Sequence, residues 1–103
     1  MFTIAALYHF TRFKNHLKLR DPLQKKCEGL GISGSLLLAS EGINGTIAGT
    51  YENIEKIIVY IKKMPGCANL EYKTSVSKLP PFPRMKVKLK KEIVTMGQPN
   101  IDP

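Results

Sequence analysis

The residues best suited to chemistry are basic and lie close together, late in the chain. From Arg84 to Lys90, basic and apolar residues alternate without a break in the order RMKVKLK. A period of two is typical of a β-strand, so Met85, Val87 and Leu89 are expected to face the core and the basic residues to face outward. Same-face residues of a strand lie about 7 Å apart, close to the spacing of phosphates along a nucleic-acid strand. The predicted nucleic-acid contacts are Arg84, Lys86, Lys88, Lys90 and Lys91.

Two interpretations of this basic strand remain open, because lysines also keep an edge strand soluble and unpaired. The chain has sixteen Lys and Arg against eight Asp and Glu, a net charge of +8, and five of these cations fall within Arg84–Lys91. This concentration favours an acidic partner, and nucleic acid rather than a membrane surface. Since no run of about eighteen apolar residues is present, no membrane-spanning helix is expected.

A second polar segment, Ser40–Thr46, reads SEGINGT and contains two glycines that would let a ligand approach the backbone. Glu41 and Asn44 are its candidate functional residues, as contacts to RNA or to another domain. The competing interpretation is that the glycines supply backbone geometry and that Asn44-Gly45 forms a tight turn.

The two cysteines are predicted to be structural. Cys27 and Cys67 lie forty residues apart, without a CxxC motif or a suitably spaced His pair, so no metal site is expected. Neither has an evident activating neighbour, which argues against catalysis. Two unpaired thiols in a basic domain indicate the reducing cytoplasm.

The elements that position these residues begin with a strand at Thr3–Phe10, apolar on both faces and therefore expected in the middle of a sheet. Apolar residues then recur at helical spacing from Leu19 to Leu30. Pro22 leaves two possibilities: it is the first helical residue after an Asp21 N-cap, or it lies inside a longer helix that begins near Asn15.

Strands are predicted at Ile32–Ala39 and Gly45–Gly49, as an antiparallel hairpin, and at Leu70–Val76. Between them, a helix capped by Thr50 carries isoleucines at i, i+3, i+4 and i+7 from Ile54 onward. The order predicts an α+β, ferredoxin-like (acylphosphatase-like) β-α-β-β-α-β sandwich, with an antiparallel sheet, both helices on one face and an extra C-terminal basic strand. Residues 1–96 are assigned to this domain and 97–103 to a linker.

Aromatic residues are a further candidate for RNA contact, because rings stack on bases. No RNP-type aromatic sequence is found on a central strand, so core packing or a domain interface is the favoured role. The rings concerned are Tyr8, Phe10, Phe13 and Phe82.

Three segments together resemble the N-terminal domain of the bacterial tRNA uridine hydroxylases, a rhodanese-related family: TIAALYHF (Thr3–Phe10), SEGINGT (Ser40–Thr46) and KVKLKKEIVT (Lys86–Thr95). The resemblance extends from Thr3 to Pro103. It implies that a catalytic rhodanese domain follows this one, with a loop cysteine to which neither Cys27 nor Cys67 corresponds. It also implies a full-length enzyme that uses molecular oxygen to form 5-hydroxyuridine at the tRNA wobble position. The implied partners are tRNA and the rhodanese domain, and the domain alone is expected to be inactive and to hold no cofactor.

A resemblance to acylphosphatases, in the run LGISGSLLLASEGINGTIAGT, would make the domain a small hydrolase. That family holds phosphate in a glycine-containing loop after the first strand. The equivalent loop, Phe10–Asn15, has Arg12 but no glycine, and the family's water-orienting asparagine would fall near Leu38. The resemblance therefore implies the fold and not the activity. A purely structural scaffold for the rhodanese domain is the other alternative.

Overall fold

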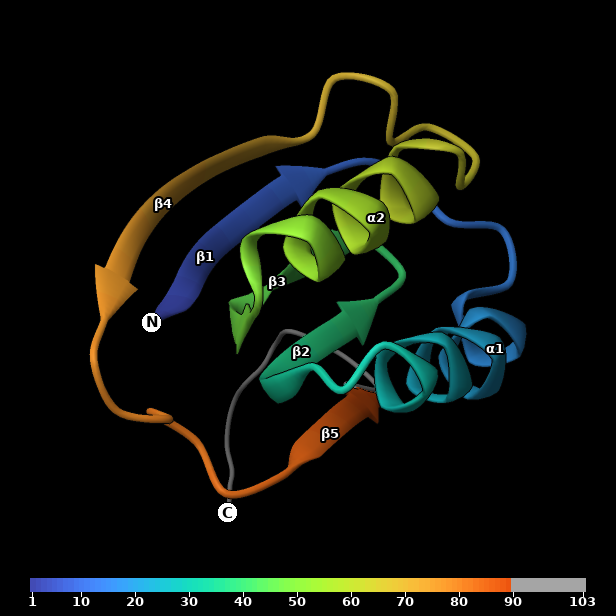
Figure 1. Cartoon of the computed structure of the whole chain (residues 1–103). Coiled ribbons are helices and arrows are strands. Elements are labelled where there is room, and N and C mark those ends of the chain that lie inside the picture. Colours follow the sequence, from blue (N-terminus) through green and yellow to red (C-terminus); the bar gives the residue numbers. More distant parts are fainter. Residues whose placement is uncertain (90–103) are drawn as a thin grey trace, which may run out of the picture.

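The computed structural model describes residues 1–89 of the chain (Figure 1). Along these residues the elements follow the order β-α-β-β-α-β-β. The predicted linker at 97–103, and the last part of the predicted domain at 90–96, lie outside the described residues. The elements are β1 Phe2–Phe10, α1 His16–Gly29, β2 Ser33–Ala39, β3 Gly42–Gly49, α2 Tyr51–Lys62, β4 Glu71–Ser77 and β5 Met85–Leu89.

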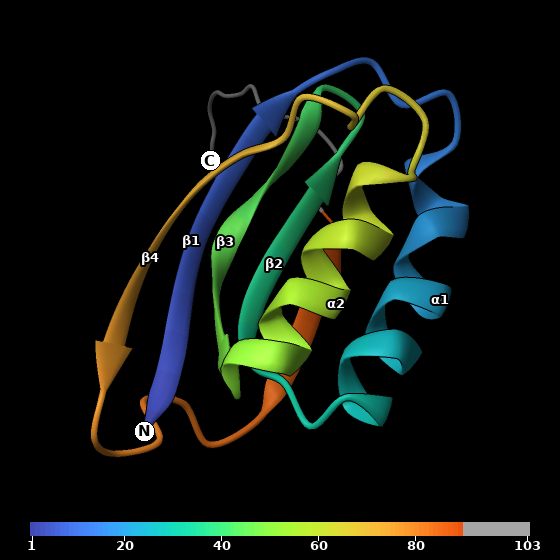
Figure 2. The ribbon, with the colours of Figure 1, turned by 45° about the horizontal axis from the view of Figure 1, so that its top comes forward.

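The strands form one sheet in the order β4-β1-β3-β2-β5. The first four are antiparallel to their neighbours, and β5 joins the free side of β2 in parallel. Figures 1 and 2 show α1 and α2 packed on the same face of this sheet. The predicted ferredoxin-like fold is confirmed, with β5 as the extra strand. We call the face opposite the two helices the outer face.

The β2–β3 hairpin turns earlier than the sequence indicates. Its turn is Ser40-Glu41, and β3 begins at Gly42. Asn44 is paired with Tyr8 on one side and Leu37 on the other, so the prediction of a turn at Asn44-Gly45 is wrong. Gly45 has a φ of +152° where a Cβ would lie 2.2 Å from the Ser35 carbonyl oxygen. The glycine therefore permits close strand packing instead of a chain reversal.

Helix α1 takes the longer of its two predicted forms. It begins after Asn15 and contains Pro22 in its interior. An interior proline costs about 3 kcal/mol because it removes a backbone hydrogen bond and crowds the preceding turn. The turn before Pro22 makes contacts that offset this cost, because Leu19 packs against the core and Arg20 Nε donates to the Val87 carbonyl at 2.9 Å.

Helix α2 agrees with its prediction. The Thr50 hydroxyl accepts a hydrogen bond from the Asn53 backbone N–H at 3.2 Å, a cap that stabilises a helix by about 1 kcal/mol. The isoleucines on its inner face are at most 3% exposed: Ile54, Ile57, Ile58 and Ile61. Neither described helix has the length and apolar character that a membrane span requires.

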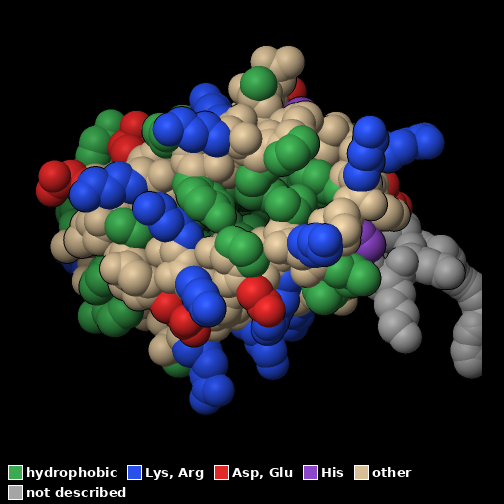
Figure 3. Space-filling model, turned by 90° about the vertical axis from the view of Figure 1, so that its right-hand side faces the viewer, with side chains coloured by type: hydrophobic (Ala, Val, Ile, Leu, Met, Phe, Trp, Pro, Cys, Tyr) green, Lys and Arg blue, Asp and Glu red, His purple; other side chains and the backbone are tan. Residues whose placement is uncertain are grey.

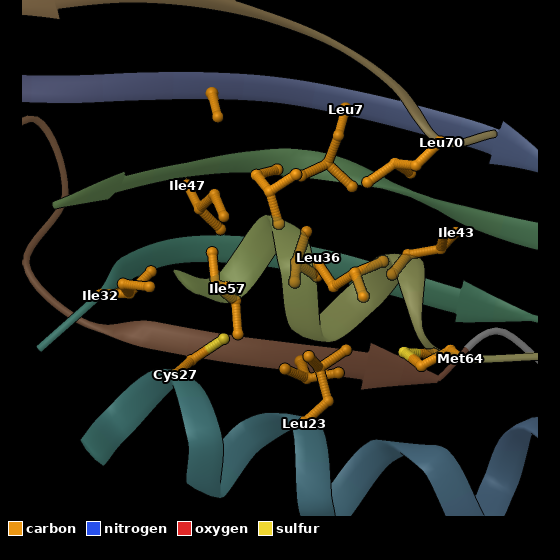
Figure 4. Close-up of a cluster of buried hydrophobic side chains, with 14 of the residues drawn as sticks. Leu7, Leu23, Cys27, Ile32, Leu36, Ile43, Ile47, Ile57, Met64 and Leu70 are labelled. Carbon is orange, nitrogen blue, oxygen red and sulfur yellow. The ribbon is translucent and has the colours of Figure 1, made fainter. Parts of the chain in front are cut away.

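The core lies between the helices and the sheet, as the close-up in Figure 4 shows. Leu36 from β2 and Leu7 from β1 meet Ile57 from α2 there, and Leu23 enters from α1. Val87 of β5 belongs to the same cluster and is 0% exposed. The core thus fixes which side of each strand faces outward, including the strand that carries the basic residues.

Candidate nucleic-acid interface

The basic strand lies at one edge of the sheet, with its lysines directed away from the core. Lys86 and Lys88 are exposed, and they alternate with the buried Met85 and Val87. Arg84 lies just before β5 and is also exposed, while Lys90 and Lys91 lie outside the described residues. Leu89 pairs with the fully buried Leu38 and so lies on the core side as predicted, but it is 40% exposed at the end of the strand.

Side chains of α1 hold β5 in place along its outer edge. Gln24 Nε2 donates to the Met85 carbonyl at 3.2 Å, and its Oε1 accepts from the Val87 N–H at 2.7 Å. Arg20 Nε donates to the Val87 carbonyl at 2.9 Å. These bonds replace the partner strand that an edge strand lacks. Keeping the edge unpaired therefore does not require the lysines, which weakens the alternative explanation for their presence.

The strand register places the lysines in line with side chains from the whole outer face. Because pairing partners in adjacent strands point to the same side, the outer face is crossed by rows of neighbouring side chains. One row runs Lys88, Leu37, Asn44, Tyr8, Glu71. The next runs Lys86, Ser35, Thr46, Ala6, Lys73. The basic edge is therefore continuous with a mixed polar and aromatic surface.

Two aromatic rings stand on this face, so core packing is wrong for them, while the domain interface, the other favoured role, stays a prediction. Tyr8 is 51% and Phe10 75% exposed, and both belong to β1, a central strand. Their ring centroids are 5.4 Å apart at an interplanar angle of 84°. Phe13 does enter the core, and Phe82 is half-buried. Strand alternation could have predicted this exposure, because Tyr8 and Phe10 point to the side of β1 opposite to the buried Ala5 and Leu7.

The surface is hollowed on both sides of Tyr8. One hollow of about 820 Å³ extends from Tyr8 and Asn44 toward Glu71 and Lys73 on β4. A smaller one of about 230 Å³ lies between Phe10, Leu37 and the β2–β3 turn, and it too is lined by Tyr8 and Asn44. Tyr8 and Asn44 thus form a shared wall between two depressions on the outer face.

The two candidate residues of the SEGINGT segment belong to different elements of the fold. Asn44 lies within β3, exposed on the outer face. Glu41 lies in the turn, where its backbone carbonyl accepts a hydrogen bond from the Thr11 N–H at 3.0 Å. They are therefore not two contacts of one flexible loop, although both line the smaller hollow beside Phe10 and Leu37. Asn44 also belongs to the row of side chains that ends in Lys88.

The Ser40-Glu41 turn is hydrogen-bonded to the loop Phe10–Asn15, which corresponds to the loop in which an acylphosphatase holds phosphate. Besides the Thr11 bond to Glu41, the Phe13 N–H donates to the Ser40 carbonyl at 2.9 Å. These two N–H groups of the loop are therefore not available to an anion. Leu38, near the position of the water-orienting asparagine, is 0% exposed and belongs to the core. The geometry does not favour phosphate-ester or acyl-phosphate chemistry at this loop.

The cysteine thiols are buried and held in their protonated form. Burial, with a smaller contribution from Glu28, raises the pKa of Cys27 to about 12, and burial also raises the pKa of Cys67. A protonated thiol is a poor nucleophile. Over residues 1–89, no group of three or more His, Cys, Asp or Glu side chains is arranged to hold a metal ion.

Basic side chains are also found away from β5. On the side of the molecule that lies to the right in Figure 1, Lys and Arg side chains surround a central area of hydrophobic ones (Figure 3). Two cations of the helices rest on rings: Lys26 lies 5.8 Å from the Tyr60 ring centroid, and Lys62 lies 5.6 Å from that of Tyr72. One ion pair is found within the described part of the chain, Arg20–Asp21 at 2.7 Å. What distinguishes β5 is therefore the regular spacing of its lysines on a sheet face that also carries exposed aromatics.

Comparison with known proteins gives one family. A family model described as the UPF0176 acylphosphatase-like domain matches residues 2–93. A protein of Gluconobacter oxydans named tRNA uridine(34) hydroxylase is 61% identical over 97% of this chain, which corresponds to 32% of that protein's length. A protein of the same name from Roseobacter denitrificans is 50% identical over 100% of this chain and 35% of its own length. The chain thus spans about a third of the length of the curated relatives it matches.

Solved structures share the fold at low sequence identity. An acylphosphatase from Bacillus subtilis has a TM-score of 0.66 at 12% identity, over 84% of this chain and 98% of that one. The BLUF protein BlrB has a TM-score of 0.70 at 17% identity, over 84% of this chain and 72% of that one. Identities this low relate the folds alone, so neither activity is carried over to this chain.

Proposed function

The chain belongs to the UPF0176 acylphosphatase-like domain family, and on that premise we propose that it is the N-terminal, tRNA-binding accessory domain of a tRNA uridine hydroxylase. The observation that carries this proposal is the 61% identity to a protein of that name, spread over nearly the whole chain but only 32% of the relative. In this proposal the complete cytoplasmic enzyme uses molecular oxygen to form 5-hydroxyuridine at the wobble position. A rhodanese domain beyond this chain carries out the chemistry.

The accessory role is supported by the state of the reactive groups. Both thiols are buried, with raised pKa values, so neither is poised as the nucleophile that a rhodanese loop requires. The loop corresponding to the acylphosphatase site has the N–H groups of Thr11 and Phe13 bonded internally. A binding role therefore fits the described residues better than a hydrolytic one.

The tRNA contact is assigned to the basic strip, which we define as Arg84, Lys86, Lys88, Lys90 and Lys91. Lys86 and Lys88 are exposed and about 7 Å apart on a strand that α1 holds at its outer edge. Because the backbone of β5 is held in place, the two cations are presented at this spacing without any rearrangement of the chain. Phosphate contacts position the substrate without reading its sequence. The strip would therefore hold tRNA in place for the catalytic domain.

Titration of the chain with tRNA over a salt series tests this role. The variant Lys86→Glu/Lys88→Glu is compared with Lys25→Glu/Lys56→Glu, which changes the net charge equally on exposed residues of α1 and α2. Each lost phosphate contact lowers the slope of log affinity against log salt by roughly 0.7–0.9, so the β5 variant should lose about 1.5 from its slope. The control should keep the wild-type slope.

Equal behaviour of the two variants would contradict the assignment, because position and not net charge is the claim. The alternative of a purely structural scaffold predicts a different result. In that case the β5 variant would bind tRNA like the wild type but would associate less well with the rhodanese domain supplied as a separate polypeptide.

A further inference from the structure

We propose that the outer face binds unpaired nucleotides, with Tyr8 and Phe10 stacking on bases while Lys86 and Lys88 hold the adjoining phosphates. The inference rests on the proposed function above and makes it more specific, because it selects single-stranded RNA over duplex. It follows from the juxtaposition of two exposed rings on a central strand with a basic edge strand in the same sheet.

The rings are positioned to receive bases. They stand 5.4 Å apart and nearly perpendicular, at 84°, so they offer faces in two directions. Phe10 is 75% exposed and lacks any polar atom in its side chain, which makes its exposure unfavourable unless a partner covers it. Every base has an apolar π-face that can stack on such a ring, whereas bases inside a duplex are already covered by their neighbours. A single strand is therefore the form of RNA that these rings can bind.

The distance between rings and lysines fits a short run of nucleotides. Tyr8 and Lys88 belong to the same row but lie three strands apart, a lateral distance of roughly 14 Å at about 4.8 Å per strand. One nucleotide cannot place its base at one end of that distance and its own phosphate at the other. A strand crossing the sheet can do so, because its bases can settle over β1 while its backbone continues to β5.

The side chains between the two ends suit such a strand. Asn44 lies between Leu37 and Tyr8 and offers both a donor and an acceptor to a base edge. Beyond Tyr8 the row ends in Glu71, whose carboxylate would repel a phosphate but can accept from an exocyclic amine of a base. The row therefore has a cation, Lys88, at its β5 end and a carboxylate, Glu71, at its β4 end. This charge distribution favours an RNA strand that places its phosphates over β5 and its bases over β1 and β4. Lys73, in the next row, can contact a strand that continues across β4.

Charge complementarity selects RNA over a protein surface as the occupant. The outer face carries Lys73, Lys86 and Lys88 against the single carboxylate of Glu71 among its paired positions in the two rows. The second row also contains Ser35 beside Lys86, and both Ser and Lys are depleted at protein–protein interfaces relative to the rest of the surface. A polyanion with exposed aromatic bases matches this mixture.

The test uses a ten-residue single-stranded RNA carrying 2-aminopurine, and a duplex of the same sequence. Stacking on an aromatic ring quenches 2-aminopurine fluorescence, so quenching by the unmodified chain reports base contact directly. Tyr8→Leu/Phe10→Leu should weaken single-strand binding at least about tenfold and abolish the quenching. Tyr51→Leu, which removes a ring that is 66% exposed on α2, should change neither quantity.

The outcomes separate this inference from the proposed function. If Tyr8→Leu/Phe10→Leu binds and quenches like the wild type while Lys86→Glu/Lys88→Glu loses tRNA, phosphate contact stands and stacking is overturned. A wild-type preference for the duplex, or an absence of quenching, also overturns it. The stacking inference is also overturned if Tyr8→Leu/Phe10→Leu binds RNA like the wild type but no longer associates with the separately supplied rhodanese domain. The outer face would then be a domain interface. Wild-type quenching gives a result even if a variant fails to fold.

Discussion

Gln24 of α1 accepts a hydrogen bond from the backbone N–H of Val87 in β5, with 2.7 Å between Gln24 Oε1 and Val87 N. The same amide donates to the Met85 carbonyl, so one side chain satisfies two groups on the strand's outer edge. A helix residue thereby takes the place of a neighbouring strand. This arrangement holds β5 in the sheet and fixes the direction in which its lysines point.

Gln24→Ala should lower the free energy of unfolding by about 1–3 kcal/mol. The substitution leaves the part-buried Val87 N–H without its partner, and an unsatisfied buried donor costs about that much. Urea denaturation followed by circular dichroism measures the change. Lys25→Ala, at the next position and exposed, is the control and should lie within about 0.5 kcal/mol of the wild type. A loss no larger than that of the control would show that the edge bonds do not stabilise β5.

Gly45→Ala should destabilise the fold by about 3 kcal/mol or more. Its Cβ would lie 2.2 Å from the Ser35 carbonyl oxygen, and the φ of +152° is unfavourable for any side chain. Gly29→Ala is the matched control, because nothing lies within 4 Å of the added Cβ at the end of α1. Thermal unfolding compares the two. A melting temperature of Gly45→Ala equal to that of the wild type would show that β3 does not approach β2 this closely at Gly45.

The stability of the chain should fall as the pH rises above about 9. In the unfolded chain the Cys27 thiol ionises near its ordinary pKa of 9.0, while in the folded chain its pKa is about 12. Above pH 9 the unfolded state therefore binds fewer protons than the folded state, so stability decreases with pH until about 12. Lysines and tyrosines titrate in the same range, and the comparison with Cys27→Ala isolates the thiol. The variant should show a shallower decline, and identical slopes would contradict the assignment.

Neither cysteine should react with a thiol reagent in the folded chain. Both side chains are buried, at 0% exposure, and both have raised pKa values. With iodoacetamide at pH 8, alkylation should be slower than for the urea-unfolded chain by orders of magnitude. Mass spectrometry after timed quenching gives the rates. Rapid modification of native Cys67 would show that its segment opens readily.

The chain should not hydrolyse acetyl phosphate above the protein-free rate. Two N–H groups that could bind phosphate, those of Thr11 and Phe13, donate to Glu41 and Ser40. A colorimetric assay of the remaining acyl phosphate measures turnover, with a true acylphosphatase as the positive control. Turnover that disappears in Arg12→Ala would mean that this loop is a catalytic site after all.

The sequence predicted most of the fold because local patterns and tertiary packing agree. The isoleucine spacing and the Thr50 cap define α2, and alternation defines β5. The predicted position of the β2–β3 turn was wrong. The Asn44-Gly45 pair fits a local turn rule, but its pairing with β1 and β2 overrides that preference. The ambiguity at Pro22 is resolved by contacts of the residues before it, since Leu19 packs against the core and Arg20 donates a hydrogen bond to the Val87 carbonyl of β5.

The candidate interface was predicted only in part. Lys86 and Lys88 face outward as alternation requires, while the roles of all five basic residues remain predictions, two of them outside the described residues. Tyr8 and Phe10 were assigned to the core or an interface because a strand that is apolar on both sides gives no sign of which side is covered.

By itself, the sequence determined the order of elements, the family and the concentration of positive charge near β5, because these depend on local patterns and composition. Only the tertiary structure decided that the aromatics of β1 and the lysines of β5 share a face. Strands distant in sequence become neighbours through sheet order, and the side on which both helices pack decides which residues are left outward.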